Sequence, residues 1–141
     1  MAQAAYASGC EAFVDEDYDM AVERFGRAIK LASTPKYYSS RAAAHLKLEN
    51  YTDAVSDASK CIELGGSDPK AHTRKGIACF YLDEFEAARE SFEAAEAIEK
   101  DARGADALRT WLRKCDAEIA DERGSAPAPP PAPTSTPPAP A

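Results

Sequence analysis

The sequence lacks the long apolar segments and the basic surplus that mark membrane and nucleic-acid proteins. No apolar run in its 141 residues approaches the roughly 20 residues of a membrane-spanning helix. The N-terminus has no basic region followed by an apolar stretch, as a secretory signal would have. With 24 acidic and 17 basic residues, the net charge is −7. This balance disfavours bulk affinity for nucleic acid or anionic membranes, so we expect neither as a partner.

Cysteine and histidine are sparse and form no pattern typical of a metal site or a catalytic centre. The four cysteines, Cys10, Cys61, Cys79 and Cys115, include no C-x-x-C pair. There are only two histidines, and the sequence contains no P-loop, G-x-S-x-G, H-E-x-x-H or G-x-G-x-x-G motif. We therefore expect a non-catalytic protein with no cofactor and no metal. Unpaired thiols favour a cytoplasmic location, with the nucleus as a second one.

Proline is nearly confined to the C-terminal end. Eight of the ten prolines lie in the uncharged segment 124–141, which predicts a flexible, extended proline/alanine-rich linker. A ligand for a proline-binding domain is the alternative for this segment. The other two prolines, Pro35 and Pro69, each follow a good N-cap residue, Thr34 and Asp68. Each pair therefore predicts the start of a helix.

The remaining sequence repeats itself with a period of 33 or 34 residues. Three copies align on an aromatic residue, with a small residue nine positions before it and apolar or small residues at fixed positions after it. The aligned sets are Tyr18, Tyr51 and Phe85; Gly9, Ala42 and Gly76; Ala21, Ala54 and Ala88; and Phe25, Ala58 and Phe92. Small residues at such spacing let two helices cross closely. Each copy therefore predicts two antiparallel helices of roughly 14 residues, which must stack on neighbouring copies to bury their apolar faces.

The helix boundaries follow from caps and apolar periodicity. Asp17 and Asn50 are the expected N-caps of second helices. A seventh helix is predicted over 103–123, with Trp111 on its packing face and Gly124 ending it. The predicted units are repeats at about 2–34, 35–68 and 69–102, a capping helix at about 103–123, and one domain over 1–123 followed by the linker.

This pattern resembles the tetratricopeptide repeat (TPR). The resemblance covers about residues 2–100 and rests on the recurring small, aromatic and alanine positions. It implies an all-α fold, a right-handed α-solenoid of three helix-turn-helix repeats plus a C-terminal capping helix, seven helices in all. The proline that usually closes a unit is displaced at Pro35, and Gly66 and Lys100 stand in its place in the later units.

In that architecture the first helix of each unit lines a concave groove. The eighteen inward positions hold four basic residues and no acidic one, which predicts a mildly positive, partly apolar groove. Such a groove suits an extended or helical peptide that carries carboxylates, although the enrichment is also compatible with no dedicated ligand. The candidate partner-binding residues are Lys36, Lys47, Lys70, Arg74, Tyr6, Phe13, Phe80 and Tyr81. Cys10 is the one thiol placed in the groove, and it is a candidate for redox-controlled disulfide formation.

Lys70 and Arg74 resemble the third-unit part of the carboxylate clamp with which TPR co-chaperones hold chaperone tails. They are four residues apart and share one helical face. The other clamp positions, which carry one lysine and two asparagines, are Tyr6, Cys10 and Ser40 here. Each lost charge-assisted hydrogen bond is worth roughly 1.5–3 kcal/mol. We therefore predict weak or no binding of a free chaperone tail.

A narrower resemblance is to the co-chaperone family called suppressor of the G-two allele of Skp. It rests on 11–19, on 70–79 (KAHTRKGIAC), on 114–122 in the capping helix, and on the incomplete clamp. It implies a downstream CS domain that contacts the ninety-kilodalton heat-shock chaperone. It also implies roles in plant immune-receptor stability, contact with Skp-type ubiquitin-ligase adaptors, and homodimers in some members. A clamp-type adaptor and the regulatory half of a larger enzyme, such as a prolyl isomerase or phosphatase, stay open as alternatives.

Overall fold

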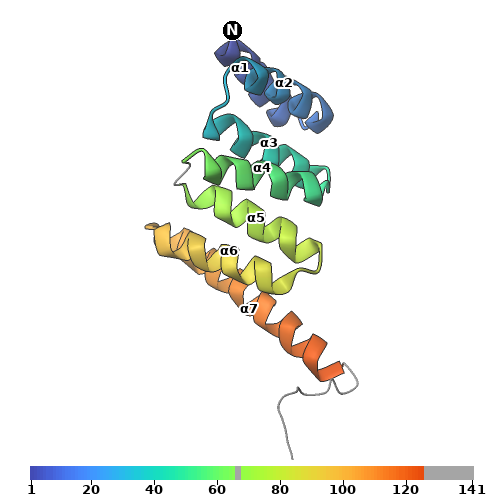
Figure 1. Cartoon of the computed structure of the whole chain (residues 1–141), viewed down its shortest axis with the longest axis vertical. Helices are drawn as coiled ribbons and strands as arrows, with labels where there is room; N and C mark the ends of the chain where they lie inside the picture. The colour runs from blue at the N-terminus through green and yellow to red at the C-terminus, as the bar shows by residue number, and fades with distance from the viewer. Residues whose placement is uncertain (66–67, 126–141) are drawn as a thin grey trace, which may run out of the picture.

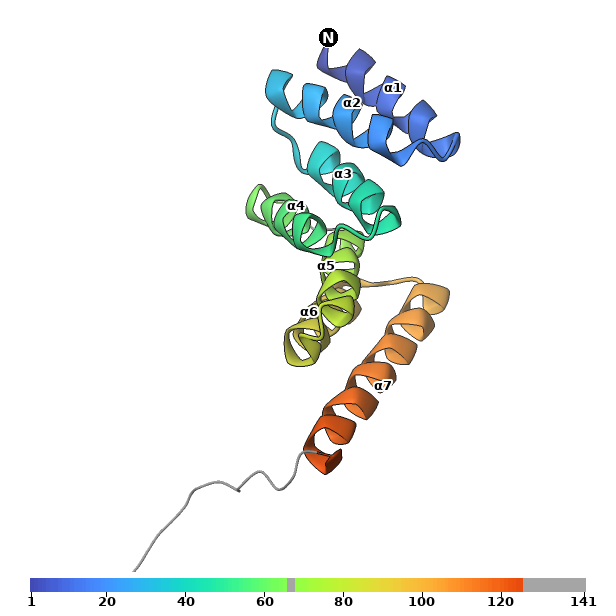
Figure 2. The same ribbon diagram turned by 90° about the vertical axis from the view of Figure 1, so that its right-hand side faces the viewer.

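The computed structural model describes residues 1–65 and 68–125, and these residues form seven helices. The helices are α1 (Ala2–Val14), α2 (Tyr18–Leu31), α3 (Pro35–Lys47), α4 (Tyr51–Glu63), α5 (Pro69–Tyr81), α6 (Phe85–Ile98) and α7 (Ala102–Ser125). Each packs against the next along the chain, so that the helices descend in order from α1 to α7 (Figure 1). Successive hairpins are rotated relative to one another, which gives the stack its twist (Figure 2). The predicted all-α solenoid of three repeats plus a capping helix is confirmed.

Most of the expected helix caps form. The Thr34 hydroxyl accepts a hydrogen bond from the backbone N–H of Tyr37 at 3.4 Å, and the Asp68 carboxylate accepts one from Lys70 at 2.9 Å. Asp17 likewise caps α2 through its side chain. Asn50 stands at the N-cap position of α4 as expected, but its side chain makes no capping hydrogen bond there.

The three hairpins share one turn geometry that the sequence analysis did not identify. Glu16, Glu49 and Asp83 all adopt left-handed backbone conformations, with φ of 63°, 62° and 64°. The next residue in each turn donates its N–H to the carbonyl five positions back, as Asn50 does to His45 at 2.8 Å. This backbone hydrogen bond pairs a carbonyl that the C-terminal end of the first helix would otherwise leave without a partner. The repeated turn therefore connects the two helices of every unit through the same local backbone geometry.

The closest approach of the paired helices depends on a glycine facing a phenylalanine. A Cβ placed on Gly9 would lie 2.6 Å from the Phe25 ring, and one on Gly76 would lie 2.7 Å from Phe92. Both rings are buried, with exposures of 1% and 0%. In the second unit two alanines occupy the equivalent positions. Ala42 replaces the glycine and is larger than it, whereas Ala58 replaces the phenylalanine and is smaller than it.

Helix α7 covers the apolar face of the third unit. Leu108 and Cys115 are buried in the same cluster as Phe92, and the Trp111 ring stacks on Phe92 at 5.3 Å between centroids. The helix continues through Gly124 to Ser125, so Gly124 does not end it, contrary to expectation. A single glycine disfavours an exposed helix by only about 1 kcal/mol and need not interrupt it.

The predicted linker 124–141 lies outside the described residues from 126 onward and stays a prediction. Among the described residues, no helix has the length and apolar character needed to cross a membrane.

Candidate functional site

A cationic cavity of about 420 Å³ opens where the first helices of the three units meet. Its lining combines cations, hydroxyls and one carboxylate, drawn mainly from α1, α3 and α5. The lining residues are Tyr6, Pro35, Lys36, Ser39, Ser40, Cys61, Asp68, Lys70 and Arg74. Three cations and one carboxylate give this cationic cavity a net charge of +2, within a chain whose net charge is −7. Four of the predicted binding residues, Tyr6, Lys36, Lys70 and Arg74, are therefore brought together here.

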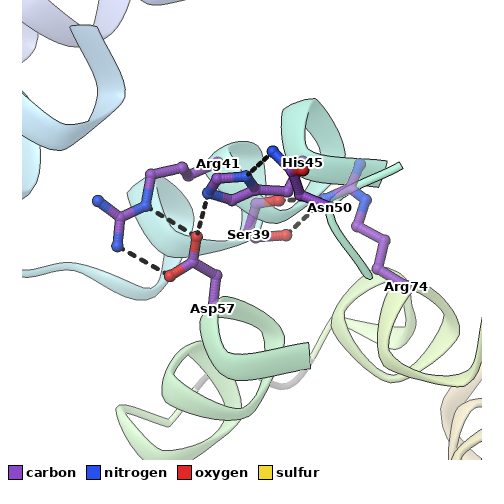
Figure 3. Close-up of polar contacts among 6 residues, drawn as sticks. All are labelled: Ser39, Arg41, His45, Asn50, Asp57 and Arg74. Atoms are coloured by element: carbon purple, nitrogen blue, oxygen red, sulfur yellow. Dashed lines mark hydrogen bonds and ion pairs between the residues drawn. The ribbon is translucent and has the colours of Figure 1, made fainter. Parts of the chain in front are cut away.

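Arg74 is the most constrained cation of the cationic cavity. Its Nη1 donates hydrogen bonds to the Ser39 carbonyl oxygen at 3.0 Å and to the Ser39 hydroxyl at 2.6 Å (Figure 3). Burial lowers the pKa of its guanidinium, and the nearby Asp68 carboxylate opposes that shift. Arg74 thus joins the third unit to the second and holds its charge at the cavity wall.

Tyr6 also lines the cationic cavity, and its ring contacts Lys36. Its hydroxyl shares a hydrogen bond of 3.0 Å with the Ser40 hydroxyl. The Lys36 Nζ lies 5.0 Å from the centroid of the Tyr6 ring, within the range of a cation–π contact. The Tyr37 ring stacks on Tyr6 at 4.9 Å. Burial is the main reason why the pKa of Tyr6 is raised.

An apolar cavity of about 250 Å³ adjoins the cationic one. It is lined by Cys10, Phe13, Val14, Phe25, Ser40, Ala43 and Arg74. Ser40 and Arg74 line both cavities, so the two are neighbours; together they are called the groove, with a charged part and an apolar part. The structure places the predicted residues Phe13 and Cys10 in the apolar part, and Cys10 is half-buried with a free thiol.

The other predicted binding residues lie elsewhere. Lys47 is exposed in the last turn of α3 and lines neither cavity. Phe80 and Tyr81 belong to an aromatic cluster, in which Tyr81 stacks on Tyr51 at 5.1 Å and Phe80 meets Trp111 edge-on at 5.3 Å. Phe80 packs against the core of the third unit, and this contact gives it a structural role.

A polar cluster between α3 and α4, formed by Arg41, His45, Asn50 and Asp57, was not predicted from the sequence. The Arg41 guanidinium makes two hydrogen bonds of 2.8 Å to the carboxylate of Asp57, which is only 5% exposed. His45 Nε2 lies 3.6 Å from the same carboxylate, and Asn50 Nδ2 lies 3.5 Å from His45 Nδ1 (Figure 3). Burial lowers the pKa of His45 although Asp57 opposes the shift.

A sequence signal for this cluster exists. Arg41 and Asp57 are 16 residues apart, the same separation as the Gly9–Phe25 and Gly76–Phe92 contacts. Opposite charges at this separation could therefore have been predicted to face each other across the hairpin. Within residues 1–65 and 68–125, no three histidine, cysteine, aspartate or glutamate side chains gather in a way that could hold a metal ion.

The fold and its groove define a TPR domain, and comparisons with known proteins agree. No family model matches the chain. It is 41% identical to the protein SGT1 homolog of Oryza sativa subsp. japonica over 117 residues, which cover 82% of this chain and 31% of that protein. The chain spans about a third or less of the length of the curated relatives that it matches.

Two solved structures have the same architecture. The first TPR domain of human RPAP3 superposes with a TM-score of 0.80 at 26% identity, covering 89% of this chain and 97% of that one. The first TPR of Spaghetti (RPAP3), bound to the HSP90 peptide SRMEEVD, superposes with a TM-score of 0.79 at 26% identity. The match covers 84% of this chain and 93% of that one. The chain therefore has the fold of a TPR domain, and it resembles the SGT co-chaperones.

Proposed function

We propose that the chain is the non-catalytic protein-binding domain of a co-chaperone. In this proposal the whole protein links the ninety-kilodalton heat-shock chaperone system to clients such as immune receptors and to Skp-type ubiquitin ligases, in the cytoplasm and nucleus. The cationic cavity carries the proposal, because it gathers Lys36, Lys70 and Arg74 on an otherwise acidic domain. The 41% identity to the rice SGT1 homolog supports the choice of co-chaperone class.

The groove is suited to a segment of a partner protein rather than to a small substrate. Lys36 and Lys70 are exposed, so their charges can approach an acidic partner. The adjoining apolar cavity can accept one aliphatic side chain of the same segment. Together the two cavities offer charge and apolar contacts along one extended path, as peptide recognition requires.

Binding of a purified Skp-type adaptor tests the proposal. The Lys70→Glu/Arg74→Glu variant reverses two charges of the cationic cavity, and we expect it to weaken adaptor binding at least tenfold. The matched control is Lys30→Glu/Lys60→Glu, which reverses two exposed charges on the second helices α2 and α4. Circular dichroism checks that both variants remain helical. Equal binding by both variants would contradict a role for the groove.

A chaperone-tail adaptor is the second candidate. It is favoured by Lys70 and Arg74 at the cavity and by the peptide bound to the Spaghetti domain. Against it, the Tyr6 and Ser40 hydroxyls bond to each other, and Cys10 offers no amide donor. We expect the peptide SRMEEVD to bind weakly or not at all in a calorimetric titration. Micromolar binding that Arg74→Ala abolishes would favour this candidate instead.

Self-association is a further part of the proposal. Size-exclusion chromatography with and without reductant measures it directly. A dimer that disappears with reductant and in Cys10→Ser would assign the half-buried Cys10 thiol to an intermolecular disulfide. A dimer that persists in both cases would indicate a non-covalent interface.

A further inference from the structure

We propose that the cationic cavity binds a phosphoryl group on a side chain of a partner peptide, while an apolar side chain of that peptide enters the adjoining cavity. This inference rests on the proposed function, because it names the chemistry of the segment that the groove accepts. It concerns phosphorylated serine or threonine, and it differs from recognition of a free C-terminal carboxylate.

The cationic cavity keeps a third positive charge, although the first-unit clamp position carries no lysine. Tyr6 stands where a clamp lysine would be, but its ring holds the Lys36 ammonium of the next unit at 5.0 Å from the centroid. Lys36 lines the same cavity as Lys70 and Arg74. Three cations therefore still converge, two of them exposed lysines whose positions can adapt to a ligand.

Arg74 retains unused donors that suit an oxyanion. Only its Nη1 is occupied, by the two hydrogen bonds to Ser39. Within residues 1–65 and 68–125, its Nη2 and Nε donate no hydrogen bond. A guanidinium edge with free N–H groups at a cavity wall can bind two oxygens of one phosphoryl group. Ser39 keeps that edge oriented, so little conformational entropy is lost when the anion binds.

The remaining donors favour a dianion over a carboxylate. The carboxylate-binding amides of the clamp are absent, since Cys10 and Ser40 occupy those positions. In their place the cavity offers the Tyr6 and Ser40 hydroxyls. The hydrogen bond between them uses one hydroxyl hydrogen, and the other can turn toward an anion. Its net charge of +2 matches a phosphoryl group, which carries −1.5 to −2 charges at neutral pH. A single carboxylate would neutralise only half of that charge.

The apolar cavity restricts what stands beside the phosphorylated residue. Ser40 and Arg74 form the boundary between the two cavities. In an extended peptide, side chains two residues apart point the same way and lie roughly 7 Å apart. We therefore expect an aliphatic residue two positions from the phosphorylated one, in contact with Phe13 and Ala43.

A symmetric probe tests this chemistry without assuming a binding direction. The probe is fluorescein-Ala-Leu-Ala-phosphoserine-Ala-Leu-Ala-amide, measured by fluorescence polarisation beside the same peptide with serine or aspartate at the centre. We expect the phosphorylated peptide to bind at least tenfold more tightly than either. Lys36→Gln and Lys70→Gln should each weaken it at least threefold, while Lys47→Gln, which removes an exposed charge outside both cavities, should not.

Each outcome decides the inference. Equal binding of the phosphorylated and aspartate peptides, or no binding of the phosphorylated one, would overturn it. So would phosphopeptide binding that Lys36→Gln and Lys47→Gln reduce alike. Adaptor binding that depends on Lys70 and Arg74 but is indifferent to phosphate would leave the proposed function standing while this inference fails. The two proposals are thereby separated.

Discussion

Replacing Gly76 by alanine tests the close helix crossing on which the third unit depends. A Cβ at this position would lie 2.7, 2.8 and 2.9 Å from three atoms of the Phe92 ring. Contacts under 3.0 Å require a displacement, and the ring has little room because it is fully buried and Trp111 stacks on it. The added methyl group must therefore push α5 and α6 apart.

Two opposing effects set the magnitude. Alanine is preferred over glycine in a helix interior by about 1 kcal/mol. Overpacking a filled core typically costs about 1–3 kcal/mol, and the rigid Phe92–Trp111 stack places this site in the upper half of that range. We expect Gly76→Ala to lower the free energy of unfolding by about 1–2 kcal/mol, measured by urea denaturation.

The middle repeat supplies a rescue for this change. Two alanines, Ala42 and Ala58, occupy the equivalent positions there and are fully buried. Phe92→Ala alone should cost about 3–5 kcal/mol. The double variant Gly76→Ala/Phe92→Ala reproduces the pairing of the middle repeat, so its cost should fall short of the sum of the single costs by at least about 1 kcal/mol.

Gly26→Ala is the matched control for Gly76→Ala. A Cβ on Gly26 would lie 3.4 Å from Nη1 of the Arg41 side chain, whose end can shift. This variant should be as stable as the wild type or more stable, by up to about 1 kcal/mol. If Gly76→Ala proved equally harmless, or if the double variant were additive, the argument for a close crossing would be refuted.

Three further predictions follow from the buried groups. Asp57→Asn leaves the Arg41 charge without its partner and should cost about 3 kcal/mol in urea denaturation, with much less cost when Arg41→Met is added. Burial lowers the pKa of folded His45 below 6.5, so the unfolded chain binds the extra proton; stability should fall as the pH drops below about 6.5, and less so in His45→Gln. Burial raises the pKa of Cys115 to about 11, so Ellman's reagent at pH 8 should modify the half-buried Cys10 first and Cys115 only after denaturation; equal rates in the native protein would contradict this.

The local and repeating features were predictable from the sequence. Thr34 and Asp68 cap their helices because an N-cap depends on contacts within one turn. The glycine–phenylalanine crossing recurs at the same separation in the first and third copies, and the small and aromatic positions around it recur in all three copies. Lys70 and Arg74 share a helical face because they are four residues apart, whatever the rest of the fold does.

The features that were not predicted depend on contacts between residues of different helices. Asn50 has the right side chain and position to cap α4, but its amide lies against His45 at the end of α3. Lys36 contacts the Tyr6 ring only because of the rotation between the first and second units. That rotation is a property of the packed stack, and no short stretch of sequence contains it.

The missed polar cluster also positions the candidate site. Helix α3 presents Lys36 and Ser40, four residues apart, to the cationic cavity, while Arg41 on the same helix is bonded to Asp57 of α4. A bidentate, partly buried ion pair fixes the rotation of α3 about its own axis, and with it the direction of Lys36 and Ser40. Asp57→Asn should therefore weaken phosphopeptide binding although Asp57 does not line that cavity. In the structure this pair holds α3 in a fixed rotation against α4.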